Sequence, residues 1–266
     1  MKRVFLTGAS SGIGLATAEA LLAAGHEVWG TSREPEALPQ RERFHPVQLD
    51  LRNTGEIEEV FARALGEAGH FDVVINNAGS GHFGAAELLS VSEIADQFQV
   101  AFFAHVRLMQ LALGDMRRRN SGLIVNVTSL AAILPVPFMG AYNAAKSAMA
   151  SFTMSVQLEL PDSKVRVIDL QPGDIRTEFN EAVSKGKLDP QYETRVVKTW
   201  EAVERNMKAA PKPELVAHCI LNLIDRDNPP PFLTAGDIFQ TKIAPLIFRF
   251  LPQRIRIWGL KKYYGI

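Results

Sequence analysis

The sequence predicts an α/β fold: a doubly wound parallel sheet of about seven strands with helices on both faces. Short aliphatic and β-branched runs alternate with longer segments of helical period, which is typical of successive strand–helix–strand units. The 266 residues are 47% hydrophobic and 22% charged. A chain of this size and balance can bury a large core, so we expect a single domain over residues 1–266.

The strands are expected where short runs of aliphatic and β-branched residues occur. In chain order these are residues 4–6, 26–30, 44–48, 73–75, 122–127, 164–170 and 232–234. Three consecutive prolines at 229–231 form a stiff loop into the last of them. Segments of helical period lie between the strands, at residues 14–24, 54–68, 91–119 and 142–159. Because crossover helices join parallel strands, the sheet should be covered on both faces.

Two segments near the C-terminus differ from this alternation. Residues 178–213 are charged and helix-capable, have no strand pattern, and are interrupted by Gly186 and Pro190. A segment of this kind inserted after the sixth strand is typical of a lid over a site. Residues 238–266 form a tail in which Pro245 and Pro252 should prevent one continuous helix.

The composition excludes several classes of function. The 29 Lys and Arg residues balance the 29 Asp and Glu residues, so no global charge attracts a polyanion and we expect no nucleic-acid partner. The one cysteine, Cys219, lies in an apolar stretch and is expected to be a buried core thiol. No Cys or His spacing suits a metal site, and none is expected. With neither a signal peptide nor a membrane-spanning run in the sequence, a cytoplasmic protein is expected.

A glycine-rich turn follows the first predicted strand and opens the first predicted helix. Glycines at such a turn permit a tight bend and a close approach to pyrophosphate, whose charge the helix N-terminus favours. This position between strand and helix makes the motif informative, although a glycine-rich turn without a ligand remains the alternative. The residues expected to contact a dinucleotide here are Gly8, Ser10, Ser11, Gly12, Ile13 and Gly14.

The end of the second predicted strand indicates which dinucleotide binds. In NAD-binding sheets an acidic residue there usually holds the ribose 2′-hydroxyl, whereas an arginine accommodates a 2′-phosphate. This chain has Thr31, Ser32 and Arg33 at that place. Because Arg33 could bind phosphate through charge-assisted hydrogen bonds, NADP(H) is predicted in preference to NAD(H). The alternative is that Arg33 only ends the strand or pairs with Glu34.

Further motifs follow in a fixed order along residues 1 to about 180. They are Asp50-Leu51, Asn76-Asn77-Ala78-Gly79, Ser129, Tyr142-Asn-Ala-Ala-Lys146 and Pro172-Gly173-Asp-Ile-Arg-Thr177. Together with the G-x-x-x-G-x-G spacing of the glycine turn, they resemble the short-chain dehydrogenase/reductase family. The resemblance implies a Rossmann-type sheet and an oxidoreductase that uses a nicotinamide dinucleotide.

The same resemblance implies where the cofactor contacts lie. Residues after the third strand would flank the adenine, those after the fourth would line the adenosine and ribose, and those after the sixth would border the nicotinamide. In that order the residues are Asp50 and Leu51, then Asn77, Ala78 and Gly79, then Pro172, Gly173, Ile175 and Thr177. Tyr142 and Lys146 are expected to contact the cofactor as well.

Tyr142 and Lys146 are predicted to carry the chemistry together with Ser129. The tyrosine and the lysine lie four positions apart in a predicted helix, so they share one face about 6 Å apart along its axis. The ordinary pKa of a tyrosine phenol is about 10. The Lys146 ammonium and the oxidised nicotinamide ring would both lower this pKa for Tyr142, because both positive charges favour the phenolate form. Tyr142 should therefore exchange a proton with the reacting oxygen. Ser129 resembles the family serine that hydrogen-bonds this oxygen.

One position departs from the family pattern. The long central helix of the family usually supplies an asparagine that holds a water beside the lysine, but here Ala101 stands at that place. Gln97 and His105 each lie one helical turn away, and either could substitute. The interpretation we favour is that both only face solvent or a neighbouring helix.

The substrate is expected to be a small hydrophobic carbonyl or alcohol compound. Apolar residues accompany the motifs, and apolar walls with a few polar groups are typical of ligand pockets, although ordinary core packing is the alternative. These residues are Phe83, Leu130, Val136, Phe138, Met139 and Phe179. The pattern looks like the hydroxysteroid and retinol dehydrogenase branch, which implies a steroid, retinoid or acyl-lipid-like substrate.

The tail could also contact a membrane. No acidic residue follows Asp237, and basic residues alternate with aliphatic and aromatic ones over residues 243–266. Such a segment can lie at a membrane surface, drawn by anionic lipid and apolar burial. Packing over the substrate entrance or onto a partner subunit is the alternative. The family resemblance implies a homodimer or homotetramer through the helices around residues 91–116 and 142–159.

Two other functions fit parts of this sequence. A catalytically weak NADP(H)-binding redox sensor or regulatory protein is supported by Ala101 and opposed by Ser129, Tyr142 and Lys146. An epimerase or dehydratase acting on a nucleotide sugar usually needs a longer C-terminal substrate domain than this chain has.

Overall fold

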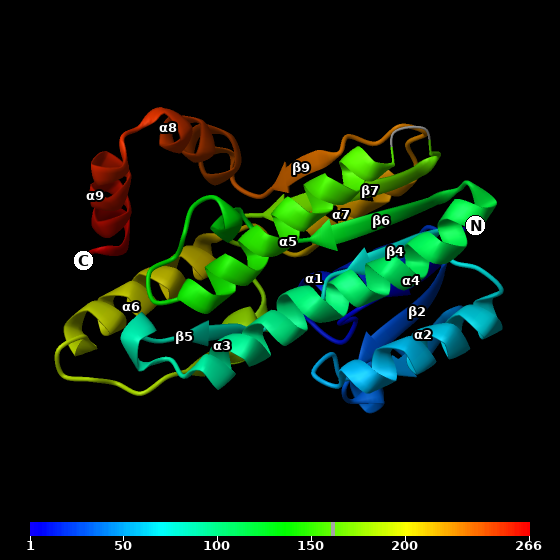
Figure 1. The fold of residues 1–266 in the computed structure, drawn as a ribbon, viewed down its shortest axis with the longest axis horizontal. Coiled ribbons are helices and arrows are strands. Elements are labelled where there is room, and N and C mark those ends of the chain that lie inside the picture. Colours follow the sequence, from blue (N-terminus) through cyan, green and yellow to red (C-terminus); the bar gives the residue numbers. More distant parts are fainter. Residues whose placement is uncertain (161–162) are drawn as a thin grey trace.

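Seven parallel strands form the main sheet in the computed structural model, which describes residues 1–160 and 163–266 (Figure 1). Their order across the sheet is β3-β2-β1-β4-β6-β7-β9. In chain order they are β1 (Arg3–Leu6), β2 (Glu27–Ser32), β3 (Phe44–Gln48), β4 (Val73–Asn76), β6 (Gly122–Val127), β7 (Val165–Pro172) and β9 (Phe232–Ala235). The predicted fold class is confirmed, and the predicted strand boundaries lie within two residues of these.

The chain reverses its direction of travel across the sheet between β1 and β4. It moves from β1 outward to β3, then returns so that β4 pairs with the other edge of β1, through Val4 with Val73 and Leu6 with Ile75. At such a switch point the loops that leave two neighbouring strands diverge, and ligands bind in the crevice between them. The fold therefore places a site at the carboxyl ends of β1 and β4.

Helices cover both faces of the sheet, and the two faces bury separate cores. One face packs against α2 (Thr54–Ala68), α4 (Ala104–Arg119) and α5 (Gly140–Glu159); the other packs against α1 (Gly12–Ala23) and α7 (Glu214–Ile224) (Figure 1). Within β1, Phe5 belongs to the first core and Leu6 to the second. Because each fully buried side chain of this size contributes roughly 1.5–3 kcal/mol, both layers hold the sheet rigid.

A π-helical turn interrupts the predicted helix over residues 91–119. The observed segments are α3 (Val91–Phe98), a π turn (Gln99–Phe103) and α4. Ser90 caps α3 through a capping box, because its hydroxyl accepts from the Glu93 backbone N–H while the Glu93 side chain accepts from that of Ser90. The π turn carries Ala101, which is fully buried. Single π turns inside helices frequently occur at functional sites.

The expectation that residues 178–213 have no strand is wrong. β8 (Val183–Lys185) pairs in parallel with β5 (Gly81–Phe83) in a second, two-stranded sheet. Val183 is buried there beside Phe83, and three residues are too short to show an alternating pattern in the sequence. The remainder of the segment contains α6 (Glu193–Ala209), in line with its helical composition.

The tail folds into two short helices. A π turn (Phe239–Ile243) leads into α8 (Ala244–Phe250), and α9 (Gln253–Tyr264) follows. Pro252 separates the two helices as expected, whereas Pro245 lies in the first turn of α8 and does not interrupt it. Figure 1 shows α8 and α9 standing apart from the sheet, with α9 next to α6. Cys219 on α7 is only partly buried against the core rather than enclosed by it. Among the described residues, no helix has the length and apolar character needed to cross a bilayer.

Candidate functional site

A cavity of about 660 Å³ lies at the carboxyl ends of the central strands. Every residue that the sequence assigned to cofactor binding or to chemistry lines it, from Gly8 after β1 to Thr177 after β7. The cavity thus brings together the loops that follow six strands: β1, β2, β3, β4, β6 and β7. No three His, Cys, Asp or Glu side chains are grouped to hold a metal within residues 1–160 and 163–266.

The glycine turn is shaped for close approach of another molecule to its backbone. Gly8 and Gly12 have φ values of +69° and +52°, a region that L side chains rarely adopt. A Cβ at Gly14 would lie 1.8 Å from the Gly8 carbonyl oxygen. The turn leads directly into α1, whose first backbone N–H groups and dipole attract a phosphate. These features fit the pyrophosphate of a dinucleotide.

Thr7 joins the two strands at the switch point, and the sequence reasoning missed it. Its Oγ1 accepts hydrogen bonds from the backbone N–H groups of Asn77 at 2.9 Å and Ala78 at 3.0 Å. The Asn77 amide nitrogen in turn donates to the Thr7 carbonyl at 2.9 Å and the Gly8 carbonyl at 3.2 Å. The only signal in the sequence was a hydroxyl residue next to the glycine turn. These bonds fix the ribose side of the expected cofactor site.

Arg33 lies exposed on the cavity wall at the end of β2. Thr31 and Ser32 are buried, and their hydroxyls accept from the backbone N–H groups of Gly8 at 3.2 Å and Glu34 at 3.1 Å. In the part of the chain that the structure describes, no carboxylate lies within ion-pair distance of Arg33. The guanidinium is therefore available to an anionic group in the cavity.

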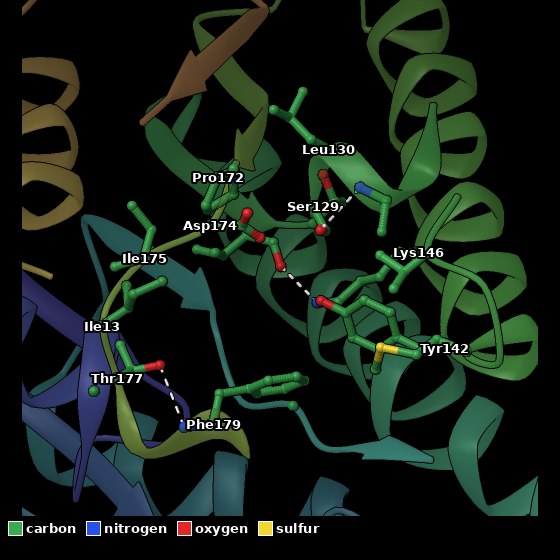
Figure 2. Close-up of a pocket in the computed structure, with 18 of the residues that line it drawn as sticks. Ile13, Ser129, Leu130, Tyr142, Lys146, Pro172, Asp174, Ile175, Thr177 and Phe179 are labelled. Atoms are coloured by element: carbon green, nitrogen blue, oxygen red, sulfur yellow. Dashed lines mark hydrogen bonds between the residues drawn. The ribbon is translucent and has the colours of Figure 1, made fainter. Parts of the chain in front are cut away.

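Ser129, Tyr142 and Lys146 meet on one wall of the cavity (Figure 2). Ser129 follows β6, where its hydroxyl caps a short 3-10 turn by accepting from the Ala131 N–H at 3.0 Å. Tyr142 and Lys146 occupy the first turns of α5, and the Lys146 Nζ lies 5.9 Å from the centre of the Tyr142 ring. The Ser129 hydroxyl also acts on the Tyr142 phenol, whose pKa it lowers.

Burial dominates the electrostatics of this group. It raises the pKa of Tyr142 above its ordinary value, the Ser129 hydroxyl lowers this pKa, and the charge of Asp174 raises it. Burial also lowers the pKa of Lys146 to about 8, and nearby Asp169 raises it. The ammonium form therefore predominates at neutral pH.

Gln97 and His105 do not face solvent, so of the two placements expected for them only packing inside the protein remains. Gln97 is buried, and its side-chain amide donates to the Ser80 carbonyl at 3.0 Å, beside the loop after β4. His105 is also buried. Burial and the Lys146 charge lower the pKa of its imidazole to about 3. Gln97, Ala101 and His105 are therefore all buried.

The apolar residues predicted for the substrate side divide into two groups. Leu130, Val136, Met139 and Phe179 line the cavity. Phe83 and Phe138 lie behind this wall, where the Phe83 ring packs 4.8 Å from Trp200 and 6.0 Å from Phe138. The pairing of β5 with β8 turns Phe83 away from the cavity, so ordinary core packing describes these two residues.

Part of the cavity wall comes from residues that the motifs did not indicate. Met207 of α6, and Phe248, Leu251 and Tyr264 of the tail, all line the cavity. Tyr263 links the two segments, because its hydroxyl accepts from the Asn206 amide at 3.0 Å. The tail composition was a signal, but no pattern in the sequence shows which cavity a distant helix closes.

Known proteins resemble this chain over most or all of its length. Residues 2–188 match the family model described as short chain dehydrogenase. The chain is 30% identical to 3-ketodihydrosphingosine reductase of Bacteroides thetaiotaomicron, over 99% of this chain and 98% of that protein. It is 36% identical to 2,3-dihydro-2,3-dihydroxybenzoate dehydrogenase of Escherichia coli, over 67% and 71% of the two chains. The crystal structure of a short-chain dehydrogenase from Streptomyces avermitilis matches with a TM-score of 0.85 and 30% identity, over 98% and 96%.

Proposed function

The chain belongs to the short-chain dehydrogenase family and is an oxidoreductase, and we propose that it reduces a hydrophobic ketone with NADPH. One observation carries this proposal: a serine hydroxyl, a phenol and an ammonium group converge on the wall of a cavity that also holds the glycine turn. We assign Ser129, Tyr142 and Lys146 as the catalytic residues. The reverse reaction would oxidise the corresponding secondary alcohol by the same steps, and an aldehyde could replace the ketone.

The three side chains have separate roles in the proposed mechanism. Ser129 donates a hydrogen bond that orients the substrate carbonyl oxygen. When bound, NADPH supplies the hydride that forms the new C–H bond at the carbonyl carbon. The Tyr142 hydroxyl gives its proton to the oxygen as the C=O double bond becomes a single bond, which leaves an alcohol and a phenolate. The Lys146 ammonium stabilises that phenolate and would bind the ribose hydroxyls of the cofactor.

The other predicted residues would hold the cofactor, and the residues present fit it. The glycine turn would bind the pyrophosphate, Asp50 and Leu51 the adenine, and Asn77 to Gly79 the ribose side. The loop from Pro172 to Thr177 would border the nicotinamide. Arg33 supports NADP(H) over NAD(H), since its free guanidinium can take the 2′-phosphate. The solved relatives do not decide this, because some are complexed with NADP+ and others with NADH.

The cavity supports a lipid-like substrate. Beyond Tyr142 its wall is largely apolar with a few polar side chains, and α6 and the tail extend this wall. The Bacteroides reductase, which resembles the chain through the tail as well, acts by its name on a ketone of a long-chain lipid. We therefore favour an acyl-lipid-like ketone over a steroid or a retinoid, and we propose that residues 178–213 act as its lid.

A substrate panel tests this proposal and its main rival together. Purified protein would be mixed with NADPH and, separately, a long-chain ketone, a steroid ketone and a retinaldehyde, and loss of NADPH absorbance would be followed. We expect turnover that is fastest with the long-chain ketone and slower with NADH. Tight NADPH binding without turnover of any compound would favour a redox sensor or regulatory protein, which the alanine at position 101 supports.

We also propose a peripheral contact with the cytoplasmic face of a membrane through residues 243–266. Phe250 and Trp258 are 76% and 61% exposed, and basic side chains lie among them without an acidic residue after Asp237. Such a surface suits anionic lipid headgroups. Cosedimentation with anionic vesicles should be lost in a Phe250→Glu/Trp258→Glu variant and weak with neutral vesicles. If the wild-type protein does not cosediment with anionic vesicles, the proposed membrane contact is wrong.

A homodimer or homotetramer is proposed through the long helices. Met154 and Leu158 on α5 are 60% and 77% exposed, as is about half of Phe103 before α4. Exposed apolar side chains of this size on neighbouring helices are typical of subunit interfaces. Light scattering on the purified protein should give a multiple of the chain mass, and Leu158→Glu should reduce it. A monomer at micromolar concentration would contradict this assembly.

A further inference from the structure

Asp174 is a carboxylate on the substrate side of the cavity that the proposed mechanism does not use. It lies in the loop after β7, and in Figure 2 it is drawn with Pro172, Ser129 and Tyr142 around the cavity. Its charge acts on the Tyr142 hydroxyl, whose pKa it raises. Because Asp174, Ser129 and Tyr142 line one cavity, a group bound to Asp174 would share that cavity with the carbonyl that Tyr142 protonates.

The tail fixes one side of this carboxyl group and leaves the other side free. The Gln240 side chain forms two hydrogen bonds with Asp174: its Oε1 accepts from the Asp174 backbone N–H at 2.9 Å, and its Nε2 donates to Oδ2 at 2.5 Å. The same Nε2 lies 3.2 Å from the Tyr263 hydroxyl. Oδ1 receives no hydrogen bond from any residue that the structure describes. The carboxyl group is thus held rigidly with one oxygen available.

Asp174 also has no cation partner. Within residues 1–160 and 163–266, no Lys, Arg or His side chain lies within ion-pair distance of it. Burial raises the pKa of this carboxyl group, although the Gln240 hydrogen bond lowers it. Removing a carboxylate from water without a cation costs free energy, and a positively charged ligand would offset that cost. Perturbed, unpaired carboxylates inside a cavity are often functional for this reason.

We propose that Asp174 binds an ammonium group carried by the substrate next to its reacting carbonyl. The preferred substrate is then a long-chain α-amino ketone, whose oxygen meets Ser129 and Tyr142 while its hydrocarbon chain runs along α6 and the tail. This inference rests on the proposed reductase function and adds the polar end of the substrate. Gln240 is a positioning residue, because it acts only through Asp174.

Two matched substrates test the inference in the full-length protein. They are a long-chain 2-amino-3-ketone and the same ketone without the amine, each reduced with NADPH at a pH where the amine is protonated. The quantity compared is the ratio of kcat/KM for the amino ketone to that for the plain ketone. In the wild type this ratio should be well above one. Asp174→Asn keeps the size of the side chain and still accepts from Gln240, and it should lower the ratio roughly 10- to 100-fold, chiefly through KM.

Gln240→Leu is the matched control. This variant removes the hydrogen bonds that support the Asp174 loop but keeps the Asp174 charge. It should therefore slow the reduction of both ketones, while changing the ratio of their kcat/KM values much less than Asp174→Asn does. Thermal unfolding and the Kd for NADPH would be measured for each variant to exclude a general loss of structure. If both variants change the ratio alike, Asp174 only shapes the loop and the inference is overturned.

The remaining outcomes separate this inference from the proposed function. Failure of the wild type to reduce either ketone would contradict the reductase function itself. Reduction of both ketones with a ratio near one, or a ratio that Asp174→Asn leaves unchanged, would overturn only the ammonium site. If Asp174→Asn instead weakens binding of NADP+ and not of NADPH, the carboxylate serves the oxidised nicotinamide ring and not the substrate.

Discussion

The Lys146 ammonium donates a hydrogen bond to the Val127 carbonyl at 2.9 Å. This bond joins the first turns of α5, which carry Tyr142, to the end of β6, which leads into Ser129. A side-chain-to-backbone hydrogen bond therefore ties together the two elements that carry the three catalytic candidates. Lys146 has an architectural role here in addition to its charge.

The charge on Lys146 predicts how activity depends on pH. Burial lowers its pKa from 10.5 to about 8, so the ammonium is present below about pH 8 and is lost as the pH rises through that value. The reduction rate should fall above about pH 8, since the phenolate left by proton transfer loses its stabilising charge. Lys146→Arg keeps a charge at all these pH values, so any residual activity should lack this inflection. An identical inflection in the variant would assign it to another group.

Arg33 should determine the choice between the two cofactors. Arg33→Ala should raise the KM for NADPH roughly 10- to 100-fold, because a charge-assisted bond to phosphate is lost, and should leave the KM for NADH nearly unchanged. Steady-state kinetics with both cofactors would measure this. Arg33→Lys keeps the positive charge but loses the two-pronged hydrogen-bonding geometry of the guanidinium. Its KM for NADPH should lie between those of the wild type and Arg33→Ala. If the NADPH to NADH preference stays the same in Arg33→Ala, the assignment is wrong.

Gly14 should tolerate no side chain. The Cβ of Gly14→Ala would lie 1.8 Å from the Gly8 carbonyl oxygen and 2.6 Å from the Asn77 side chain. We expect loss of NADPH binding by fluorescence titration and a lowered Tm. Gly114→Ala in α4 is the control, because its Cβ meets nothing within 4 Å. That change should stabilise the protein by roughly 0.5–1 kcal/mol.

The buried His105 should destabilise the fold in acid. Its pKa falls from 6.5 in the unfolded chain to about 3 in the folded protein, so the unfolded state binds the proton more tightly. Its contribution to stability is thus complete above about pH 6.5 and is lost as the pH falls toward 3. Urea unfolding of His105→Gln should depend less on pH in this window than that of the wild type. The control is His218→Gln, at an exposed histidine, and equal slopes for all three proteins would contradict the prediction.

The sequence predicted the parts of the site that depend on local chemistry. The glycine turn, Ser129 and the Tyr142–Lys146 pair follow from residue type, spacing and position after a strand, and all of them line the cavity. The parts that were missed depend on contacts distant in the chain. Gln240 meets Asp174 across 66 residues, and β8 forms only because β5 is there to pair with it. Neither contact has a periodic pattern that a sequence could show.

Tyr142→Phe tests the central claim most directly. This change removes only the hydroxyl that is proposed to give the proton, so it should lower kcat for a long-chain ketone with NADPH by roughly 100- to 10,000-fold. The Kd for NADPH should stay within about twofold of the wild type, since the ring still packs 5.6 Å from Phe179. Single-turnover hydride transfer from deuterated NADPH, measured in both proteins, is the deciding experiment. Transfer at the wild-type rate in Tyr142→Phe would contradict the account.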